Sequence, residues 1–495
     1  MDEKGKPTSE KGVVSPTPEG TSVEIAFSGG QIDRAVEKRM LLKFDVAVMG
    51  CFGVLYLLAN LDRNNLGNSE TMGLPKDLGL VGNQFGNAIS VFYSTYVFFE
   101  VPYSVLLKIV GPKNLLSTCM FLWGVVGMAT AFVQNAGQLY ACRVLMGIFE
   151  ACLIPSINTY LGMVYLRSEM SMRAAVYYAF SAIAGAFGGL LASAASLITN
   201  DRLPTWSWLF LIEGLITIAV APIVFFVFPK DPFNAWFLND KEKETMRLRY
   251  VQNPHLDAEE TFTWAAVFEA WKDPKTYVYA VQEFCIDFSL FGFTNFLPSL
   301  LHGMGFEGVR VQLMTVPVYA WATISFFGIA WLADRFQKRG PFLLFALLCA
   351  VLGYAIMLGT DNSTARFVSV FILATSVFTT TGLDIVWLNS NVSGHFKRAT
   401  AVGTVLTISN ISGAVAGQIY RSQDQPRYLP AVKTAMGITC VSIATCVSLM
   451  VGYVYTNKKR ERKLAEMGGG EQNTSEEAWR LGQKNDMTVY FRYTL

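Results

Sequence analysis

The segment RVLMGIFEA, Arg143 to Ala151, places an arginine and a glutamate inside a run that is otherwise apolar enough to cross a lipid bilayer. A charge in hydrocarbon costs several kcal/mol, so both side chains are expected to face a protein interior or an aqueous cavity. Seven residues at about 100° each bring Glu150 to within roughly 20° of Arg143 on a helix, about 10 Å further along its axis. This shared face suits a polar pathway through a membrane protein.

The composition of the whole chain is typical of an integral membrane protein. Hydrophobic residues make up 52% of the 495 residues and charged residues only 16%, against about 25% charged in an ordinary soluble domain. The net charge of +2 gives no argument for a nucleic-acid partner. The eight cysteines lie in apolar segments without CxxC spacing and the three histidines are scattered, so neither a disulfide framework nor a metal site is expected.

Apolar runs of at least about 18 residues occur twelve times along the chain, some interrupted by glycine or a single charge. They fall into two groups of six. The first group covers residues 44–61, 87–110, 115–133, 139–160, 174–198 and 206–227. The second group covers residues 278–301, 313–333, 341–358, 367–388, 399–420 and 431–455. The pattern predicts an all-α integral membrane fold of twelve transmembrane helices in two six-helix bundles.

Polar segments divide these groups into domains. Residues 42–229 are the expected N-terminal bundle and residues 276–456 the C-terminal bundle, joined by a cytosolic linker at residues 230–275 that contains the charge cluster DKEKE. Residues 1–41 are expected to be a disordered cytosolic N-terminus, because they are rich in Lys, Glu, Gly, Ser, Thr and Pro and begin without a short apolar signal sequence. Residues 457–495 are the expected cytosolic tail.

The orientation follows from lysine and arginine in the loops, which favour the cytosolic side. These residues gather on one face, at positions 108, 113, 167, 173, 335, 338, 339, 397, 398 and 458–463 and in the linker. Both termini are therefore predicted to be cytosolic, in a protein of the plasma membrane, although the opposite loops contain Lys76, Arg202, Arg310 and Arg427. On the outer side, the sequon at Asn362 is a candidate for N-glycosylation, with an unmodified loop as the alternative.

The two halves contain traces of a repeat, which is typical of transporters built from related bundles. GAFGG at residues 185–189 lies in the fifth run, and GAVAG at residues 413–417 lies in the equivalent eleventh run. Both offer a small-residue surface for close helix packing. LLKIVGPK at residues 106–113 ends the second run, and WLADRFQKR at residues 331–339 ends the eighth.

Several motifs in this order resemble the major facilitator superfamily, over about residues 42–455. ADRFQKR resembles the superfamily's loop motif, in which an acid and basic residues latch the cytosolic ends of the bundles, so the resemblance implies gating roles for Asp334, Arg335 and Arg339. Lys108 stands where the acid of the first half usually sits, and this departure is typical of the anion:cation symporter branch.

The fungal members of that branch share further motifs with this chain. YLLANLDRNNLGN at residues 56–68, VPYSVLLKIVGPK at 101–113, RVLMGIFEACLIPS at 143–156 and WLFLIEG at 208–214 resemble them. Those members include permeases for allantoate, nicotinate, pantothenate and biotin. The resemblance to organic-anion symporters also implies that acid-arginine pairs on the first and fourth helices serve proton coupling and anion recognition.

Four charged residues are the candidates for those two tasks. A carboxylate substrate needs a cation in place of its hydration, and arginine offers planar donors that fit it, which points to Arg63 and Arg143. Proton coupling needs a group whose pKa moves through the working range, as desolvation and a nearby arginine can arrange for a carboxylate, which points to Asp62 and Glu150. In the structural alternative, Asp62 and Arg63 reach the membrane interface and Arg143 bonds backbone carbonyls.

Other polar residues in the apolar runs leave two interpretations open. Tyr93 and Tyr96, neighbours on one face of the second run, either line a pocket for a flat carboxylate or pack between helices. Asn391 and Asn410 hydrogen-bond either the substrate or a neighbouring helix. Glu213 is expected to anchor the outer end of its helix through backbone contacts, and Asp287 has either role.

The sequence argues against an enzyme. It has no Walker A loop and no spaced cluster of nucleophile, base and orienter, and no cofactor is expected. The predicted function is secondary active transport: a monomer in membrane lipid that imports a small organic anion with a proton, the anion being a carboxylate such as a vitamin or nitrogenous acid. Efflux of a fungal secondary metabolite or drug and a nutrient-sensing transceptor are the alternatives.

Overall fold

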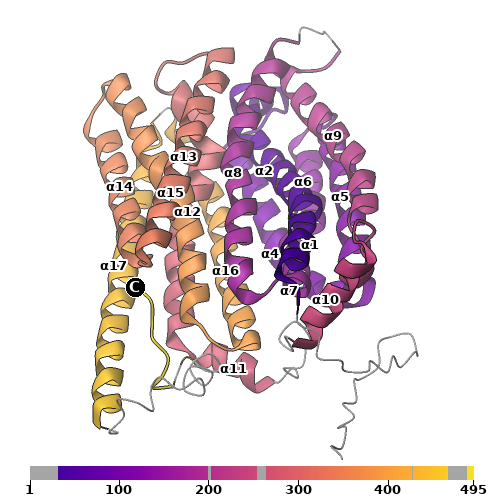
Figure 1. Cartoon of the computed structure of the whole chain (residues 1–495). Helices are drawn as coiled ribbons and strands as arrows, with labels where there is room; N and C mark the ends of the chain where they lie inside the picture. Colours follow the sequence, from indigo (N-terminus) through magenta and orange to yellow (C-terminus); the bar gives the residue numbers. More distant parts are fainter. Residues whose placement is uncertain (1–31, 199–201, 253–263, 426, 467–485, 487) are drawn as a thin grey trace, which may run out of the picture.

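The structure is a computed structural model that describes residues 32–198, 202–252, 264–425, 427–466, 486 and 488–495. The described part of the chain is helical and has no strands. Two sets of six helical paths lie side by side in Figure 1, with α2, α4 and α8 of the first set packed against α12, α16 and α13 of the second. The predicted fold of twelve helices in two bundles is confirmed.

The first set begins with α1 (Arg34–Phe44), a π-helical turn (Asp45–Met49) and α2 (Gly50–Thr71), which follow one another as a single path. A short α3 (Leu74–Asp77) follows. The remaining paths are α4 (Gln84–Val110), α5 (Pro112–Thr130), α6 (Ala136–Glu150) continued by α7 (Leu153–Val164), α8 (Arg167–Ser196) and α9 (Thr205–Val227).

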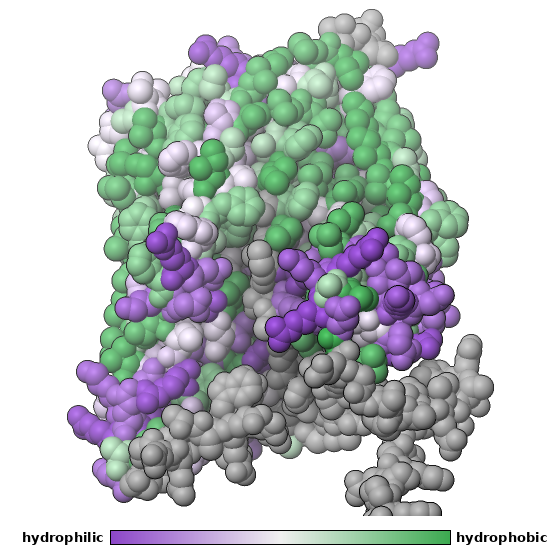
Figure 2. Space-filling view, in the orientation of Figure 1, coloured by the Kyte–Doolittle hydropathy of each residue, from purple (hydrophilic) through white to green (hydrophobic). Residues whose placement is uncertain are grey.

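The second set consists of single long helices. They are α12 (Pro274–His302), α13 (Val309–Phe336), α14 (Gly340–Gly359), α15 (Ser363–Asn391), α16 (His395–Ile419) and α17 (Leu429–Glu466). Within the described ranges, nine of the twelve paths are long and apolar enough to cross a membrane by themselves, and α4, α5 and α8 complete the two sets. Figure 2 shows hydrophobic residues over most of this face and hydrophilic residues toward the end that carries α10.

Small residues bring the two sets into close contact, as the repeat predicts. A Cβ atom on Gly185 of α8 would overlap the ring of Tyr319 in α13. In the second set, a Cβ atom on Gly417 of α16 would lie 2.5 Å from the carbonyl oxygen of Gly86 in α4. Since only glycine fits at such approaches, the GAFGG and GAVAG motifs each fix one crossing between the halves.

Polar contacts close one end of this interface. Glu70, near the end of α2, accepts hydrogen bonds from Ser299 of α12 and, at 2.9 Å, from Gln425. At the start of α4, Asn83 donates to the side chain of Gln418 at 2.9 Å. The halves are therefore sealed against each other at the end where α2 finishes and α4 begins.

The N-terminal prediction is corrected at residues 34–41, which are helical. The side chain of Asp33 accepts a hydrogen bond from the Ala35 amide at 2.8 Å and so caps α1. Glu37 of α1 pairs at 2.8 Å with Arg249, which also pairs with Glu169 of α8. A cap and a fixed counterion together stabilise a helix that composition alone marks as disordered. Residues 1–31 of that segment lie outside the described residues.

The linker also contains helices. Arg249 belongs to α10 (Asp240–Gln252), which carries the DKEKE cluster, and α11 (Trp264–Lys272) precedes α12. Lys43 of the first path donates to Glu242 of α10 at 2.6 Å. The polar linker is thus fastened to the N-terminal bundle by ion pairs.

The last residues of the chain pack against the C-terminal bundle (Figure 1). Asp486 is fully buried and accepts hydrogen bonds from Lys275 of α12 and, at 2.7 Å, from Lys397 of α16. The Thr494 carbonyl accepts from the indole of Trp387 at 2.9 Å. Residues 486 and 488–495 therefore form a docked segment, called the C-terminal segment below.

Asp486→Asn is expected to release the C-terminal segment. Burial raises the pKa of Asp486, but the two lysines lower it by more, so the pKa lies below its usual range. The ionised carboxylate therefore stabilises the docked segment at every pH above the usual aspartate pKa. This stabilisation is lost only when the pH falls through the lowered pKa of Asp486. Docking is therefore expected to persist from about pH 5 to pH 8.

Limited proteolysis measures this release. The variant leaves Lys397 with weaker partners in a buried site, so cleavage of the segment is expected to become about tenfold faster or more. The control is Glu461→Gln, which breaks an exposed ion pair with Arg492 in the same region, and exposed pairs contribute little. Equal cleavage rates in wild type and Asp486→Asn would show that the ion pairs do not hold the segment.

Candidate functional site

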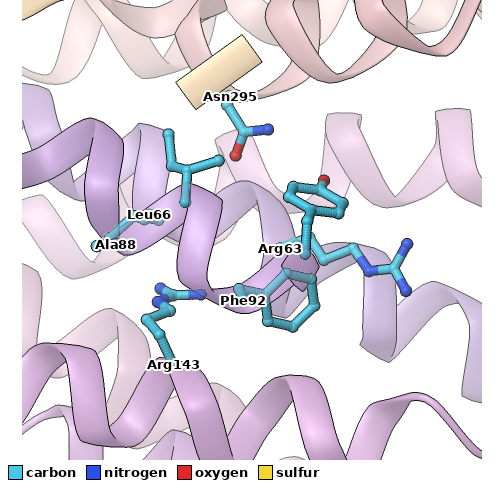
Figure 3. Close-up of a pocket in the computed structure, with 8 residues that line it drawn as sticks. Arg63, Leu66, Ala88, Phe92, Arg143 and Asn295 are labelled. Carbon is cyan, nitrogen blue, oxygen red and sulfur yellow. The ribbon is translucent and has the colours of Figure 1, made fainter. Parts of the chain in front are cut away.

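A cavity between the halves contains both predicted arginines (Figure 3). The space between its lining atoms is about 200 Å³ and is partly open to solvent. Its lining comes from α2, α4, α6 and α12 and consists of Arg63, Leu66, Ala88, Ile89, Phe92, Tyr93, Arg143 and Asn295. The cavity thus has walls from both bundles.

Arg63 is paired. Its Nε lies 2.6 Å from Oε1 of Glu150, which is 1% exposed, and its guanidinium lies 4.8 Å from the ring centroid of Tyr96. Gly147 permits the contact between Arg63 and Glu150, because a Cβ atom at this position would lie only 2.5 Å from the carbonyl oxygen of Phe92. Helix α6 therefore approaches α4 closely and delivers Glu150, at its C-terminal end, to Arg63.

Arg143 has a different environment. It is 2% exposed, and its Nη1 has only the sulfur of Met146, at 3.7 Å. Its Nε and Nη2 have no hydrogen-bond partner among the described residues. In Figure 3 its guanidinium lies beside the cavity, and that of Arg63 points away from it. A buried guanidinium with unused donors is costly, and an anion in the cavity would satisfy it.

Asp62 completes the charged set. It is 2% exposed and close enough to Arg143 to interact electrostatically, while its Oδ2 has no hydrogen-bond partner among the described residues. Asp62 is therefore buried, and Arg63 is half-buried, with 14% of its side chain exposed. The alternative in which these two residues reach the membrane interface is wrong, because α2 continues ten residues beyond Leu61, the end of the apolar run.

The two tyrosines have separate surroundings. Tyr93 lines the cavity, and its ring centroid lies 4.5 Å from that of Phe291 in the other half. Tyr96 is buried behind Arg63, with its ring face toward the guanidinium. Tyr93 can therefore meet a substrate directly, whereas Tyr96 positions Arg63.

Asn391 does not lie at this cavity, so the substrate contact predicted for it is corrected. It stands at the end of α15, donates to the Trp387 carbonyl at 3.1 Å and accepts from the Thr494 amide at 2.8 Å. Its partner is the C-terminal segment, which the hydropathy pattern could not reveal. Asn410 lies beside Glu100 of α4, which matches its alternative role as a contact between helices.

The loop after α13 contacts its own half. Arg339 lies 3.4 Å from Asp334 and donates to Ser390 of α15 at 2.9 Å, and Arg335 lies over the ring of Trp331. These contacts order the C-terminal bundle, and a gating role for them stays a prediction. The side chain of Lys108 lies outside the described residues.

Two further predicted positions have clear contacts. The Asn362 side chain accepts from the amides of Thr364 and Ala365 and caps α15, while its glycosylation stays a prediction. Glu213 accepts a hydrogen bond from the amide side chain of Asn65. That contact joins α9 to α2, so the expected anchoring through backbone contacts is corrected: the helices cross where the two side chains face each other.

Asn295 is a cavity residue that the sequence analysis missed. It supplies the wall from α12, and its Nδ2 donates to the Phe291 carbonyl at 2.8 Å. The signal was a polar side chain in the middle of the apolar run at residues 278–301, the same kind of signal that marked Arg143.

Comparison with known proteins identifies the chain's relatives. The model of the Major Facilitator Superfamily matches residues 52–417. The chain is 38% identical over 426 residues to a high-affinity nicotinic acid transporter of Saccharomyces cerevisiae, covering 86% of this chain and 80% of that protein. It is 39% identical over 435 residues to an uncharacterized transporter of Schizosaccharomyces pombe, covering 88% and 87%.

A solved structure shows the same fold at low sequence identity. The crystal structure of a D-xylose-proton symporter superimposes with a TM-score of 0.62 at 10% identity, covering 82% of this chain and 96% of that one. The fold and the relatives agree. The chain belongs to the major facilitator superfamily, and it is a multi-pass membrane transporter of a small molecule rather than an enzyme.

Proposed function

We propose that this protein is a monomer that imports a small organic anion together with a proton across the plasma membrane, with both termini in the cytosol. The observation that carries the proposal is Arg143, a buried guanidinium with unused donors at the cavity. A carboxylate satisfies a guanidinium better than a neutral solute does. The relative that transports nicotinic acid supports a carboxylate substrate.

The charges of the site balance in both states of the proposed cycle. In the empty site, Arg63 and Arg143 face Asp62 and Glu150, so the sum is zero. A proton on Glu150 removes its charge and loosens its hold on Arg63, and a monovalent anion at Arg143 restores the sum to zero. One proton and one monoanion therefore enter without leaving a net charge in a poorly solvated site.

The release step reverses this exchange. The halves rock about the site, as alternating access requires, and Glu150 then loses its proton. Its carboxylate pairs again with Arg63 and displaces the anion. The aromatic residues Phe92 and Tyr93 line the cavity with the arginines, which suits an aromatic or conjugated acid.

Glu150→Gln tests the proposal. Uptake of labelled nicotinate, pantothenate and allantoate is measured in cells at acidic and neutral outside pH, with the amount of protein at the surface determined in parallel. Wild type is expected to take up one of these acids faster at acidic pH. In the variant, acid-stimulated uptake is expected to fall about tenfold or more, because glutamine cannot bind and release a proton.

The matched control is Glu242→Gln, which removes an acid that pairs with Lys43 at the linker. Its uptake is expected to keep the acid stimulation. Wild type at the surface without acid-stimulated uptake would contradict proton-driven import of the tested acids. Acid stimulation that survives in Glu150→Gln would assign the proton to another residue.

A further inference from the structure

Three carboxyl groups are buried in the C-terminal bundle. Glu283 and Asp287 lie one turn apart on α12, and Asp384 lies on the neighbouring α15. Their exposed fractions are 0%, 5% and 0%. Among the described residues no ion pair joins any of them to a lysine or arginine. The acids of this group, called the α12–α15 acids below, thus differ from Glu150, which has Arg63.

Their hydrogen bonds are incomplete. Asp384 accepts from the amide of Gln282 at 2.8 Å, and Asp287 accepts from Thr381 at 3.2 Å. Neither oxygen of Glu283 accepts from a donor group within the described ranges. Its carboxyl lies within hydrogen-bond range of Asp384, and that contact needs a proton on one of the two acids. The side-chain oxygen of Gln282, itself fully buried, is also unpartnered there. Several hydrogen-bond acceptors thus lie together without donors. A proton bound to one of the acids provides such a donor.

Electrostatics leads to the same requirement. Glu283 is close enough to both Asp287 and Asp384 to interact with each of them. Three negative charges together in a buried site cost many kcal/mol unless cations or protons neutralise them. Among the described residues no lysine or arginine pairs with them, and bound protons on part of the group would supply the neutralisation.

We propose that Glu283, Asp287 and Asp384 are a second proton-carrying site, which takes the proton that Glu150 gives up and passes it to the end of the C-terminal bundle. This inference rests on the proposed proton-coupled function. It divides the path of the proton between the bundles: Glu150 in the N-terminal bundle takes up the proton, and the α12–α15 acids in the C-terminal bundle pass it on. Each transfer moves one proton from one carboxyl to the next carboxylate.

Side chains on one face of α12 connect the region of Arg63 with the start of α12. Asp287, Glu283, Tyr279 and Lys275 follow at intervals of four residues, each about 6 Å along the axis. Asp287 is within electrostatic range of Arg63, the partner of Glu150. At the other end, the hydroxyl of Tyr279 accepts a hydrogen bond from Tyr453 at 3.1 Å.

Few other titratable or charged groups face the α12–α15 acids. The surrounding helices α2, α16 and α17 are all packed against α12. The titratable or charged groups that interact with the acids from these helices, from α4 and from α12 itself are Arg63, Tyr56, Tyr93, Tyr279, Tyr453 and Cys446. Arg63 is the one cation among them, and Glu150 already pairs with it.

Two assays on purified protein in liposomes separate proton movement from substrate movement. The first measures accumulation of labelled nicotinate driven by an imposed proton gradient. The second measures exchange of labelled for unlabelled nicotinate at equal pH on both sides, which needs no net proton movement. Asp384→Asn and Glu283→Gln are expected to lower accumulation about tenfold or more and to keep exchange within about twofold of wild type.

Thr379→Val is the matched control, because it removes a buried hydroxyl from the same helix as Asp384 without removing a titratable group. It is expected to keep both activities. The conservative Asp384→Glu is expected to restore part of the accumulation. Since exchange reports a folded and substrate-competent protein, misfolding of a variant is recognised by its loss.

The outcomes are distinct. Undiminished accumulation in Asp384→Asn and Glu283→Gln would overturn the inference, and so would equal loss of exchange and accumulation in both variants and in Asp384→Glu. Accumulation in wild type that follows a sodium gradient instead of a proton gradient would overturn it as well. Failure of the proposed function has another signature, since wild type would then exchange nicotinate but show no response to the proton gradient.

Discussion

Arg143→Ala is expected to raise the substrate concentration for half-maximal uptake by about 100- to 10,000-fold. A hydrogen bond to a charged group is worth about 1.5–3 kcal/mol, and the unused Nε and Nη2 of Arg143 offer two such bonds to one carboxylate. Each 1.4 kcal/mol is about a factor of ten in affinity. Arg143→Lys keeps the charge but loses the planar pair of donors, so a loss of about tenfold is expected. Concentration-dependent uptake measures both.

Stability separates this role from a structural one. If Arg143 held the helices together, Arg143→Met would unfold the protein more easily. Because no carboxylate lies within ion-pair distance of its guanidinium in the described structure, Arg143→Met is expected to change the free energy of unfolding by less than the roughly 3–5 kcal/mol that breaking a buried ion pair costs. The control is Arg366→Met, which replaces another buried arginine with unpaired nitrogens but outside the cavity. The substrate affinity of Arg366→Met is expected to stay unchanged. A loss of affinity in Arg366→Met equal to that in Arg143→Met would contradict direct contact between Arg143 and the substrate.

Gly86→Val is expected to open the sealed end of the interface between the halves. A Cβ atom at this position would overlap the backbone oxygen of Gly417, and a backbone atom cannot move aside as a flexible side chain can. Overpacking of this kind costs about 1–3 kcal/mol, so the population of the conformation described here is expected to fall by about tenfold or more relative to the alternative.

Cysteine labelling measures this shift. Ala88→Cys places a thiol at the cavity, in a background in which the eight native cysteines are replaced. A membrane-impermeant reagent added from outside is expected to label it about ten times faster when Gly86→Val is present. The control is Gly328→Val, because a Cβ at this helical glycine meets nothing within 4 Å. Labelling as slow as in the parent would mean that the contact between Gly86 and Gly417 does not control access.

The sequence was informative about burial. The twelve apolar runs match the twelve helical paths, because a segment that crosses hydrocarbon must satisfy its own backbone and present apolar side chains along about 30 Å. The same rule placed Arg143 and Glu150 in the interior before any partner was known. The glycine motifs predicted close helix crossings correctly, since a missing side chain is visible in the sequence.

The sequence was less informative about partners. Glu150 pairs with Arg63, 87 residues away, although Arg143 lies on the same helix face. Asn391 meets Thr494, 103 residues away, and not the cavity. Helicity from Arg34 depends on ion pairs between α1 and the linker. Each of these contacts joins segments whose relative position the hydropathy pattern does not specify.

The sequence by itself therefore determined that the chain crosses the membrane twelve times, which residues are buried and where helices touch closely, because these properties depend on the solvent around each segment. Only the tertiary structure decided that Arg63 forms a direct ion pair while Arg143 forms none in the described structure, and that Asn295 lines the cavity from the other half. The reason is geometric: pairing of charges depends on side-chain distances of a few ångströms across helix crossings, and segments distant in the sequence set those distances.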